Sequence, residues 1–143
     1  METKINDINT VFNDVWITDK ADRNMITFAE EVGKITAEKG LSVSQIRNIF
    51  GEIKRIQTAG YENSKSAFMM LKPKVAYAYG RTVKSFFNKE TKKKTSKGNP
   101  GLLIFKKVFD VAHSKVEDKN QYGNFCNLME AIIAYHKANG GKD

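Results

Sequence analysis

Residues 42–56, SVSQIRNIFGEIKRI, carry the clearest helix signal in this chain. Ser42 and Gln45 stand in the Ser-x-x-Gln spacing of a capping box, so a helix is expected to begin near Val43. Gly60 is expected to end it. Between these signals, apolar residues recur every three or four positions, as on one face of an α-helix. The residues of this face are Ile46, Ile49, Phe50, Ile53 and Ile56.

Helical spacing continues on both sides of this stretch. It predicts further helices over residues 5–15, 22–39, 64–87, 100–112 and 125–136. Asp22 or Asp19 is expected to cap the second helix, and Asn99 followed by Pro100 marks another helix start. The chain contains no internal repeat and no dividing linker. Residues 1–143 are therefore predicted to form one all-α domain, a bundle of about five to six helices.

The chain after residue 64 contains two predicted interruptions. Pro73 lacks a backbone N–H and is expected to kink or restart its helix, which then continues to about Phe87. Residues 88–101 hold five lysines, two threonines and one serine without apolar periodicity. We expect this segment to form a mobile basic loop.

Composition limits the class of protein. With 143 residues and 41% hydrophobic content, the chain is long enough to build one core. No apolar run reaches the roughly 18 residues of a membrane span, and residues 1–9 lack the apolar centre of an export signal. A single cysteine, Cys126, suits a reducing compartment. We therefore expect a cytoplasmic protein that does not contact a membrane.

The charges of the chain are segregated. Residues 45–107 carry fifteen Lys or Arg against three acids, a local net charge of +12. Residues 1–44 sum to −3 and residues 108–143 to −1, which gives the whole chain +8. Such separation produces a positive field on one part of the surface, and the leading inference is a nucleic-acid partner.

Some of the cations of residues 45–107 fall on one helix face. In the helix predicted after Pro73, Lys74, Tyr77, Arg81 and Lys84 share one side. The opposite side carries Val75, Tyr79, Val83 and Phe86. Lysine and arginine bind phosphates, and Tyr77 can stack on a base, a contact worth about 1–3 kcal/mol. A solvated helix face with a partly buried tyrosine is the alternative interpretation.

A second basic sector lies on the helix that begins near Val43. Arg47, Gly51 and Lys54 fall beside its apolar face, and Arg55 adjoins them. Glycine in a helix interior costs about 0.8–1.0 kcal/mol relative to alanine, so something should offset Gly51. Close helix packing is the commoner reason, and close approach of a ligand backbone is the other.

Catalytic and metal-binding patterns are weak. His113 and His136 have no neighbouring Cys or His at zinc-ligand spacing, and neither a phosphate loop nor an acidic cluster is present. We therefore expect no enzyme activity, no metal and no cofactor. Cys126 and His136 are expected to pack in the core. A ribonuclease that uses both histidines as acid and base is an alternative.

A helix-turn-helix DNA-binding regulator is a further alternative. Ile35, Thr36, Gly40, Ile46 and Ile49 have the spacing of that motif. Side chains suited to reading bases would then lie at the start of the second helix. They are Ser44, Gln45, Arg47 and Asn48.

Three segments together resemble a known family. They are residues 44–49 (SQIRNI), 71–81 (LKPKVAYAYGR) and 129–137 (MEAIIAYHK), the last followed by GGKD at 140–143. In order and spacing they are similar to the small helical subunit of type III-A CRISPR effector (Csm) complexes, from about residue 20 to the end of the chain.

The resemblance implies a function that composition alone does not. Small subunits of this family stack as a minor filament beside a CRISPR-RNA-binding backbone, line the channel that receives target RNA, and have no active site. The implied partners are target RNA, CRISPR RNA, the backbone and large subunits, and further copies of the chain. The basic positions of the family correspond to Arg47, Lys74 and Arg81. Tyr79 stands where the family pattern leads us to expect a smaller residue.

Overall fold

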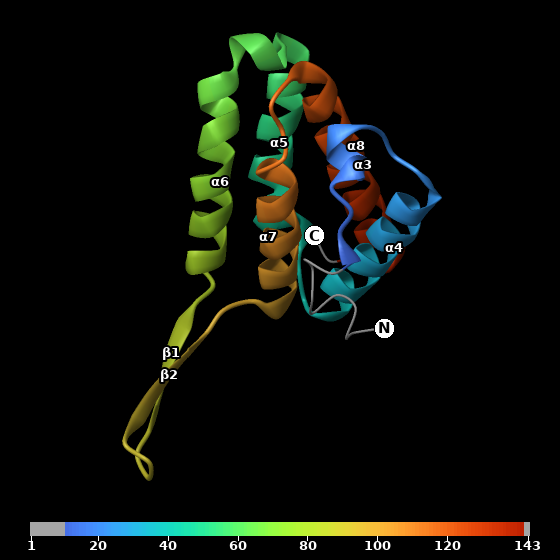
Figure 1. The fold of residues 1–143 in the computed structure, drawn as a ribbon. Helices are drawn as coiled ribbons and strands as arrows, with labels where there is room; N and C mark the ends of the chain where they lie inside the picture. The colour runs from blue at the N-terminus through green and yellow to red at the C-terminus, as the bar shows by residue number, and fades with distance from the viewer. Residues whose placement is uncertain (1–10, 142–143) are drawn as a thin grey trace.

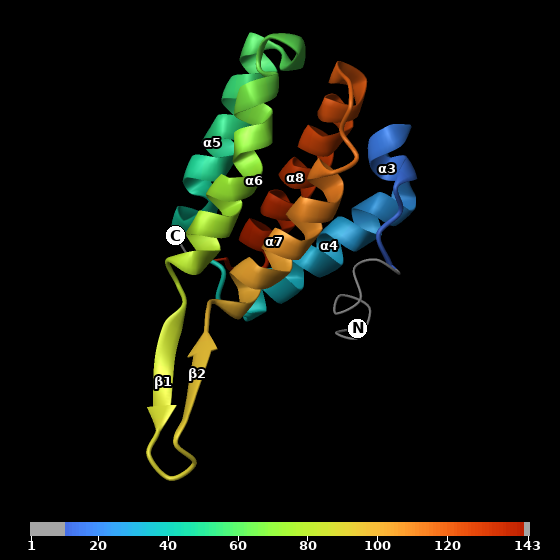
Figure 2. The same ribbon diagram turned by 60° about the vertical axis from the view of Figure 1, so that its left-hand side comes forward.

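The computed structural model describes residues 11–141, in which packed α-helices carry one projecting hairpin (Figures 1 and 2). Six α-helices are described: α3 (Val15–Thr18), α4 (Arg23–Glu38), α5 (Val43–Ala59), α6 (Lys65–Gly80), α7 (Pro100–His113) and α8 (Lys119–Ala138). A short 3-10 helix, η1 (Tyr61–Asn63), joins α5 to α6, and β1 (Lys84–Asn88) pairs antiparallel with β2 (Lys93–Lys97). The predicted helical bundle of about five to six helices is confirmed.

Helix starts follow local signals in the sequence. The backbone N–H of Ser42 donates to Oε1 of Gln45 at 2.8 Å, which satisfies one orphan donor at the start of α5. The Asp22 carboxylate accepts a hydrogen bond from the first turn of α4, and the Asn99 side chain does the same for α7. These predicted starts are confirmed. The helix predicted over residues 5–15 lies mostly outside the described residues.

The last turns of α6 differ from the prediction. The helix passes Pro73 without a break but ends at Gly80, so the predicted continuation to Phe87 is wrong. After it, the hydroxyl of Thr82 donates to the carbonyl oxygen of Tyr79 at 2.6 Å and closes the turn. Lys84 therefore lies on a strand and not on the helix face that carries Lys74.

The loop predicted over residues 88–101 is replaced in part by β2. Phe86, Phe87 and Thr95 belong to residue types that favour strands, and Phe86 pairs with Thr95 in the register. The side chain of Asn88 accepts hydrogen bonds from two backbone N–H groups of the turn that follows, at 2.9 and 3.2 Å. Lys92 adopts a left-handed φ of 57° at the end of that turn.

The core lies between α4, α7 and α8, with α5 and α6 along one side (Figure 2). Gly33 allows α4 to approach α8 closely, because a Cβ there would lie 2.6 Å from the backbone nitrogen of His136. Phe105, Phe109 and Phe125 are among the largest fully buried side chains. Within residues 11–141, every helix is too short or too polar to cross a membrane.

Candidate nucleic-acid interface

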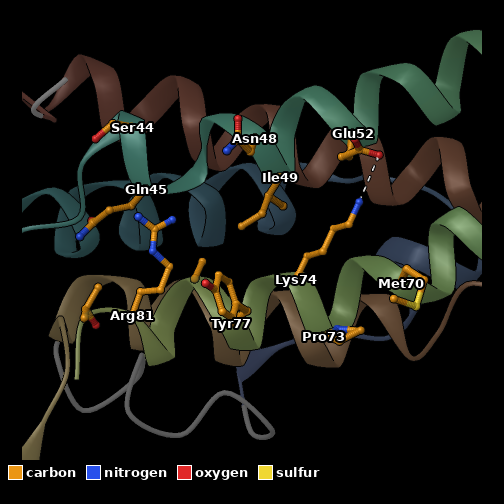
Figure 3. A pocket seen from close by; sticks show the side chains of 12 residues that line it. Ser44, Gln45, Asn48, Ile49, Glu52, Met70, Pro73, Lys74, Tyr77 and Arg81 are labelled. Carbon is orange, nitrogen blue, oxygen red and sulfur yellow. Dashed lines mark ion pairs between the residues drawn. The ribbon is translucent and has the colours of Figure 1, made fainter. Parts of the chain in front are cut away.

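An open groove of about 860 Å³ runs between α5 and α6 (Figure 3). Its apolar lining comes from Ile49, Met70, Pro73 and Ala78. Polar side chains from the first turns of α5 line the same groove, namely Ser44, Gln45 and Asn48. The groove thus combines apolar surface with hydrogen-bonding groups, as ligand-binding clefts do.

Three predicted site residues form one wall of this groove. Lys74, Tyr77 and Arg81 are three and four positions apart on α6, so their side chains share a face. Lys74 and Arg81 extend toward α5, with Tyr77 between them (Figure 3). The guanidinium of Arg81 lies 5.9 Å from the centroid of the Tyr77 ring, within cation–π range. Tyr77 is 70% exposed, so its ring is accessible for stacking.

An acidic residue outside the predicted site, Glu52, lies in the opposite wall. The carboxylate of Glu52 on α5 pairs with Nζ of Lys74 at 3.6 Å and with the guanidinium of Arg55. The hydrogen bond from Arg55, helped by the charge of Lys74, holds the pKa of Glu52 below its ordinary value. Glu52 is one helical turn after Asn48, and this spacing is the signal that places it in the groove.

The remaining predicted cations lie elsewhere. Arg47 is exposed on α5 but does not line the groove. Lys54 pairs with Glu130 of α8, and its Nζ lies 5.4 Å from the centroid of the Phe50 ring. Arg55 lines a second, smaller groove between the end of α5 and the start of α6. The structure therefore divides the predicted set and brings only Lys74, Tyr77 and Arg81 together.

Gly51 has no packing partner among the described residues. It is exposed on α5, and apart from its own helical turn and chain neighbours a Cβ built there would meet no atom of the described chain within 4 Å. The interpretation that close helix packing requires a glycine is therefore wrong. Close approach of a ligand backbone to Gly51 stays a prediction.

The two histidines do not form a surface acid–base pair. Nε2–H of His113 donates to the carbonyl oxygen of Phe68 at 2.7 Å, and burial lowers the pKa of His113. His136 is fully buried and donates through Nε2 to the carbonyl oxygen of Leu41 at 2.6 Å. Cys126 is buried as predicted, and burial raises the pKa of its thiol. Within residues 11–141, no three His, Cys, Asp or Glu side chains are grouped as a metal site.

The position of α6 disfavours the helix-turn-helix interpretation. α4 and α5 are joined at Gly40, as the motif requires, but α6 lies alongside α5. Gln45 lines a groove shared with α6 and is only partly exposed, whereas Asn48 lines the same groove and is exposed. A recognition helix needs its own surface free to enter a major groove about 12 Å wide.

The ring of Tyr79, the residue larger than the family pattern leads us to expect, packs at the base of the hairpin. A Cβ at Gly98 would lie 2.5 Å from Cζ of Tyr79, so the ring packs directly over the glycine backbone. Val83 and Phe86, which were predicted to share the apolar side with Tyr79, are exposed because the chain has left the helix before them.

Comparison with known protein families gives one result that covers most of the chain. Residues 19–142 match the family described as Csm2 Type III-A. No curated protein and no solved structure matches significantly. The matched span contains α4 to α8, both walls of the groove and the hairpin. The chain therefore belongs to the Csm2 Type III-A family, the small subunit of the type III-A CRISPR Csm complex.

Proposed function

We propose that this subunit has no active site of its own and holds target RNA, or the duplex of target and guide, through phosphate contacts that are independent of sequence. The observation that carries the proposal is the convergence of Lys74, Tyr77 and Arg81 on one wall of the groove between α5 and α6. Two cations flank an exposed ring there, which suits a phosphate backbone with an adjacent base.

Independence of sequence follows from the chemistry of these side chains. Base pairing between guide and target already reads the sequence in RNA-guided complexes. Lysine and arginine contacts to phosphate position a strand without specifying it, and tyrosine stacks on the face of any unpaired base. Arg47 adds a cation on the exposed side of α5.

We further propose that the subunit contacts CRISPR RNA, the backbone and large subunits, and further copies of itself. The sequence resemblance implies these partners. Exposed apolar side chains on α6 support a protein contact, because Met69 is 67% exposed and Met70 is 53% exposed. Co-expression with candidate subunits, followed by sequencing of co-purified RNA, tests this assembly. Recovery of repeat-derived guide RNA is expected, and its absence from purified assemblies would contradict the proposal.

RNA titrations test the phosphate contacts directly. The triple variant Arg47→Ala, Lys74→Ala and Arg81→Ala is expected to bind unrelated RNA sequences more weakly by a similar factor. Its salt dependence, the slope of log K against log salt, should flatten by about 0.7 per lost single-strand phosphate contact.

The matched control removes the same charge from another surface. Lys20→Ala, Arg23→Ala and Lys34→Ala change three exposed cations at and near α4. This variant should keep the slope of the unmodified chain. A loss of affinity confined to one RNA sequence, or an equal loss of affinity in the control variant, would contradict the proposal.

The rival functions give different results with the same preparation. A helix-turn-helix regulator would bind one duplex DNA far more tightly than random DNA in a competition assay. A ribonuclease would cut RNA unaided and lose that activity on replacement of His113 or His136. We expect neither behaviour, since Gln45 faces α6 and both histidines are buried.

A further inference from the structure

The hairpin carries aromatic and cationic side chains that are exposed to solvent. All ten residues of its strands are exposed. Phe86 is 52% exposed and Phe87 is 63% exposed. Residues 84–97 hold six lysines against one acid, Glu90. The hairpin projects away from the body where α6 ends and α7 begins (Figures 1 and 2).

The register places one phenylalanine on each face of the ribbon. Directly opposed residues share a face, and neighbours along a strand alternate. One face therefore carries Lys84, Phe86, Asn88, Lys93, Thr95 and Lys97. The other carries Ser85, Phe87, Lys94 and Ser96. Each face thus combines a ring with at least one lysine.

The base of the ribbon is fixed to the body. The ring of Tyr79 packs over Gly98, and Oγ1 of Thr82 accepts the backbone N–H of Asn99 at 2.9 Å. The side chain of Asn99 also donates to the carbonyl oxygen of Gly40, in the turn between α4 and α5, at 3.0 Å. Because Thr82 lines the groove as well, the ribbon starts at the Arg81 end of the candidate interface.

We infer that the hairpin is a second nucleic-acid contact, one that binds unpaired nucleotides by stacking bases on Phe86 and Phe87 while lysines hold the phosphates. Stacking requires unpaired bases, since paired bases inside an A-form duplex present no free face. A cluster of six lysines favours a polyanion over a protein partner, because lysine is depleted from the centres of protein interfaces. The inference rests on the proposed function only in that both concern nucleic acid, and it involves different residues.

Binding of matched oligomers to the full chain tests this assignment. Single-stranded RNA, single-stranded DNA of the same sequence and an RNA duplex serve as probes. Phe86→Ala and Phe87→Ala should each weaken single-strand binding about fivefold or more and leave duplex binding within twofold. Met69→Ala removes a side chain of similar exposure from α6 and is expected to change neither. Equal losses for RNA and DNA would show that bases and phosphates suffice, and a larger loss for RNA would add its 2′-hydroxyl to the contact.

A fluorescence reporter separates stacking from indirect effects. The native Trp16 is buried, so Phe87→Trp adds an exposed indole whose emission should be quenched by single strands and not by duplex. Unquenched emission, or Phe→Ala variants that bind single strands like the unmodified chain, would overturn the inference. So would loss of assembly with other subunits while RNA binding is retained, since that result identifies a protein contact. Lys74→Ala and Arg81→Ala should weaken the binding of single strands and of duplex alike. This difference from the Phe→Ala variants separates a test of the groove proposal from a test of the hairpin proposal.

Discussion

The carboxylate of Glu52 lies 3.6 Å from Nζ of Lys74 across the groove between α5 and α6, and it also pairs with Arg55. A glutamate is ionised at neutral pH even at its ordinary pKa, and the hydrogen bond from Arg55 lowers the pKa of Glu52 further. A phosphate that approaches Lys74 must therefore compete with an anion that the protein already supplies. Glu52 is expected to limit the affinity of the groove for RNA.

Removal of this charge should strengthen RNA binding. Glu52→Gln keeps the shape of the side chain and releases Lys74 and Arg55 from an ionised partner. Exposed ion pairs contribute about 0–1 kcal/mol, so affinity should rise up to about fivefold in RNA titrations at low salt. Glu30→Gln, at an exposed acid of α4, changes the net charge equally and serves as the control. An equal gain in both variants would mean that only net charge matters.

Gly51 offers a test that separates folding from binding. An alanine meets open space there, so Gly51→Ala should raise the free energy of unfolding by about 0.5–1 kcal/mol in urea titrations. If a ligand approaches this part of α5, RNA affinity should fall at the same time. Gly123→Ala on α8, also in open space, should stabilise the chain without affecting RNA. Unchanged RNA affinity in Gly51→Ala would remove the ligand interpretation.

His113 should make stability depend on pH. Burial lowers its pKa below the ordinary 6.5, so the unfolded chain takes up a proton at higher pH than the folded chain does. The stability that the neutral His113 contributes to the folded chain is fully present above about pH 6.5, and it is lost as the pH falls below that value. Denaturant unfolding between pH 8 and pH 5 should show this decline.

A non-titrating ring at position 113 isolates the effect. His113→Phe retains a ring where the imidazole stacks 4.0 Å from Phe68, but it cannot bind a proton. It should be less stable at pH 8 by about 1 kcal/mol, through the lost hydrogen bond, and should vary less with pH. Tyr122→Phe, which loses a buried hydrogen bond to Ile53, should keep the full pH dependence. If the free energy of unfolding changed equally with pH in the unmodified chain and both variants, the pH dependence would come from groups other than His113.

The contact between Tyr79 and Gly98 can be measured by a double-mutant cycle. Gly98→Ala forces a methyl group against the Tyr79 ring and should lower the free energy of unfolding by about 1–3 kcal/mol. Tyr79→Leu removes the ring that blocks the methyl group. In the double variant the cost of alanine should largely disappear, giving a coupling energy above 0.5 kcal/mol. Additive effects would show that the two residues do not restrain each other.

The helices were predictable because their signals are local. The caps at Asp22, Ser42 and Asn99 act over three residues, and apolar spacing marks each buried face. The end of α6 was not predictable in this way, since Val83 and Phe86 also fit helical spacing after Val75. What ends the helix is the turn at Thr82 and its contact with Asn99, seventeen residues later.

In the candidate site, too, groupings within one helix were predictable and pairings between helices were not. Lys74, Tyr77 and Arg81 could be grouped from sequence because they lie on one helix. The pairing of Lys54 with Glu130 joins residues 76 positions apart, and that of Glu52 with Lys74 joins two helices. Helical projection contains no information about which helix lies next to which, so it could not reveal either pairing.

Because Thr82 and Asn99 join the two ends of the hairpin at 2.9 Å, the segment between them forms a self-contained insertion. Its length can change without displacement of α6 or α7, and each doubling of a flexible loop costs only about 0.6 kcal/mol. The length and the net charge of the hairpin can therefore change during evolution while the packed helices stay the same. Related subunits are expected to differ most between these two positions, and the reach of the hairpin becomes a trait that selection can adjust separately from folding.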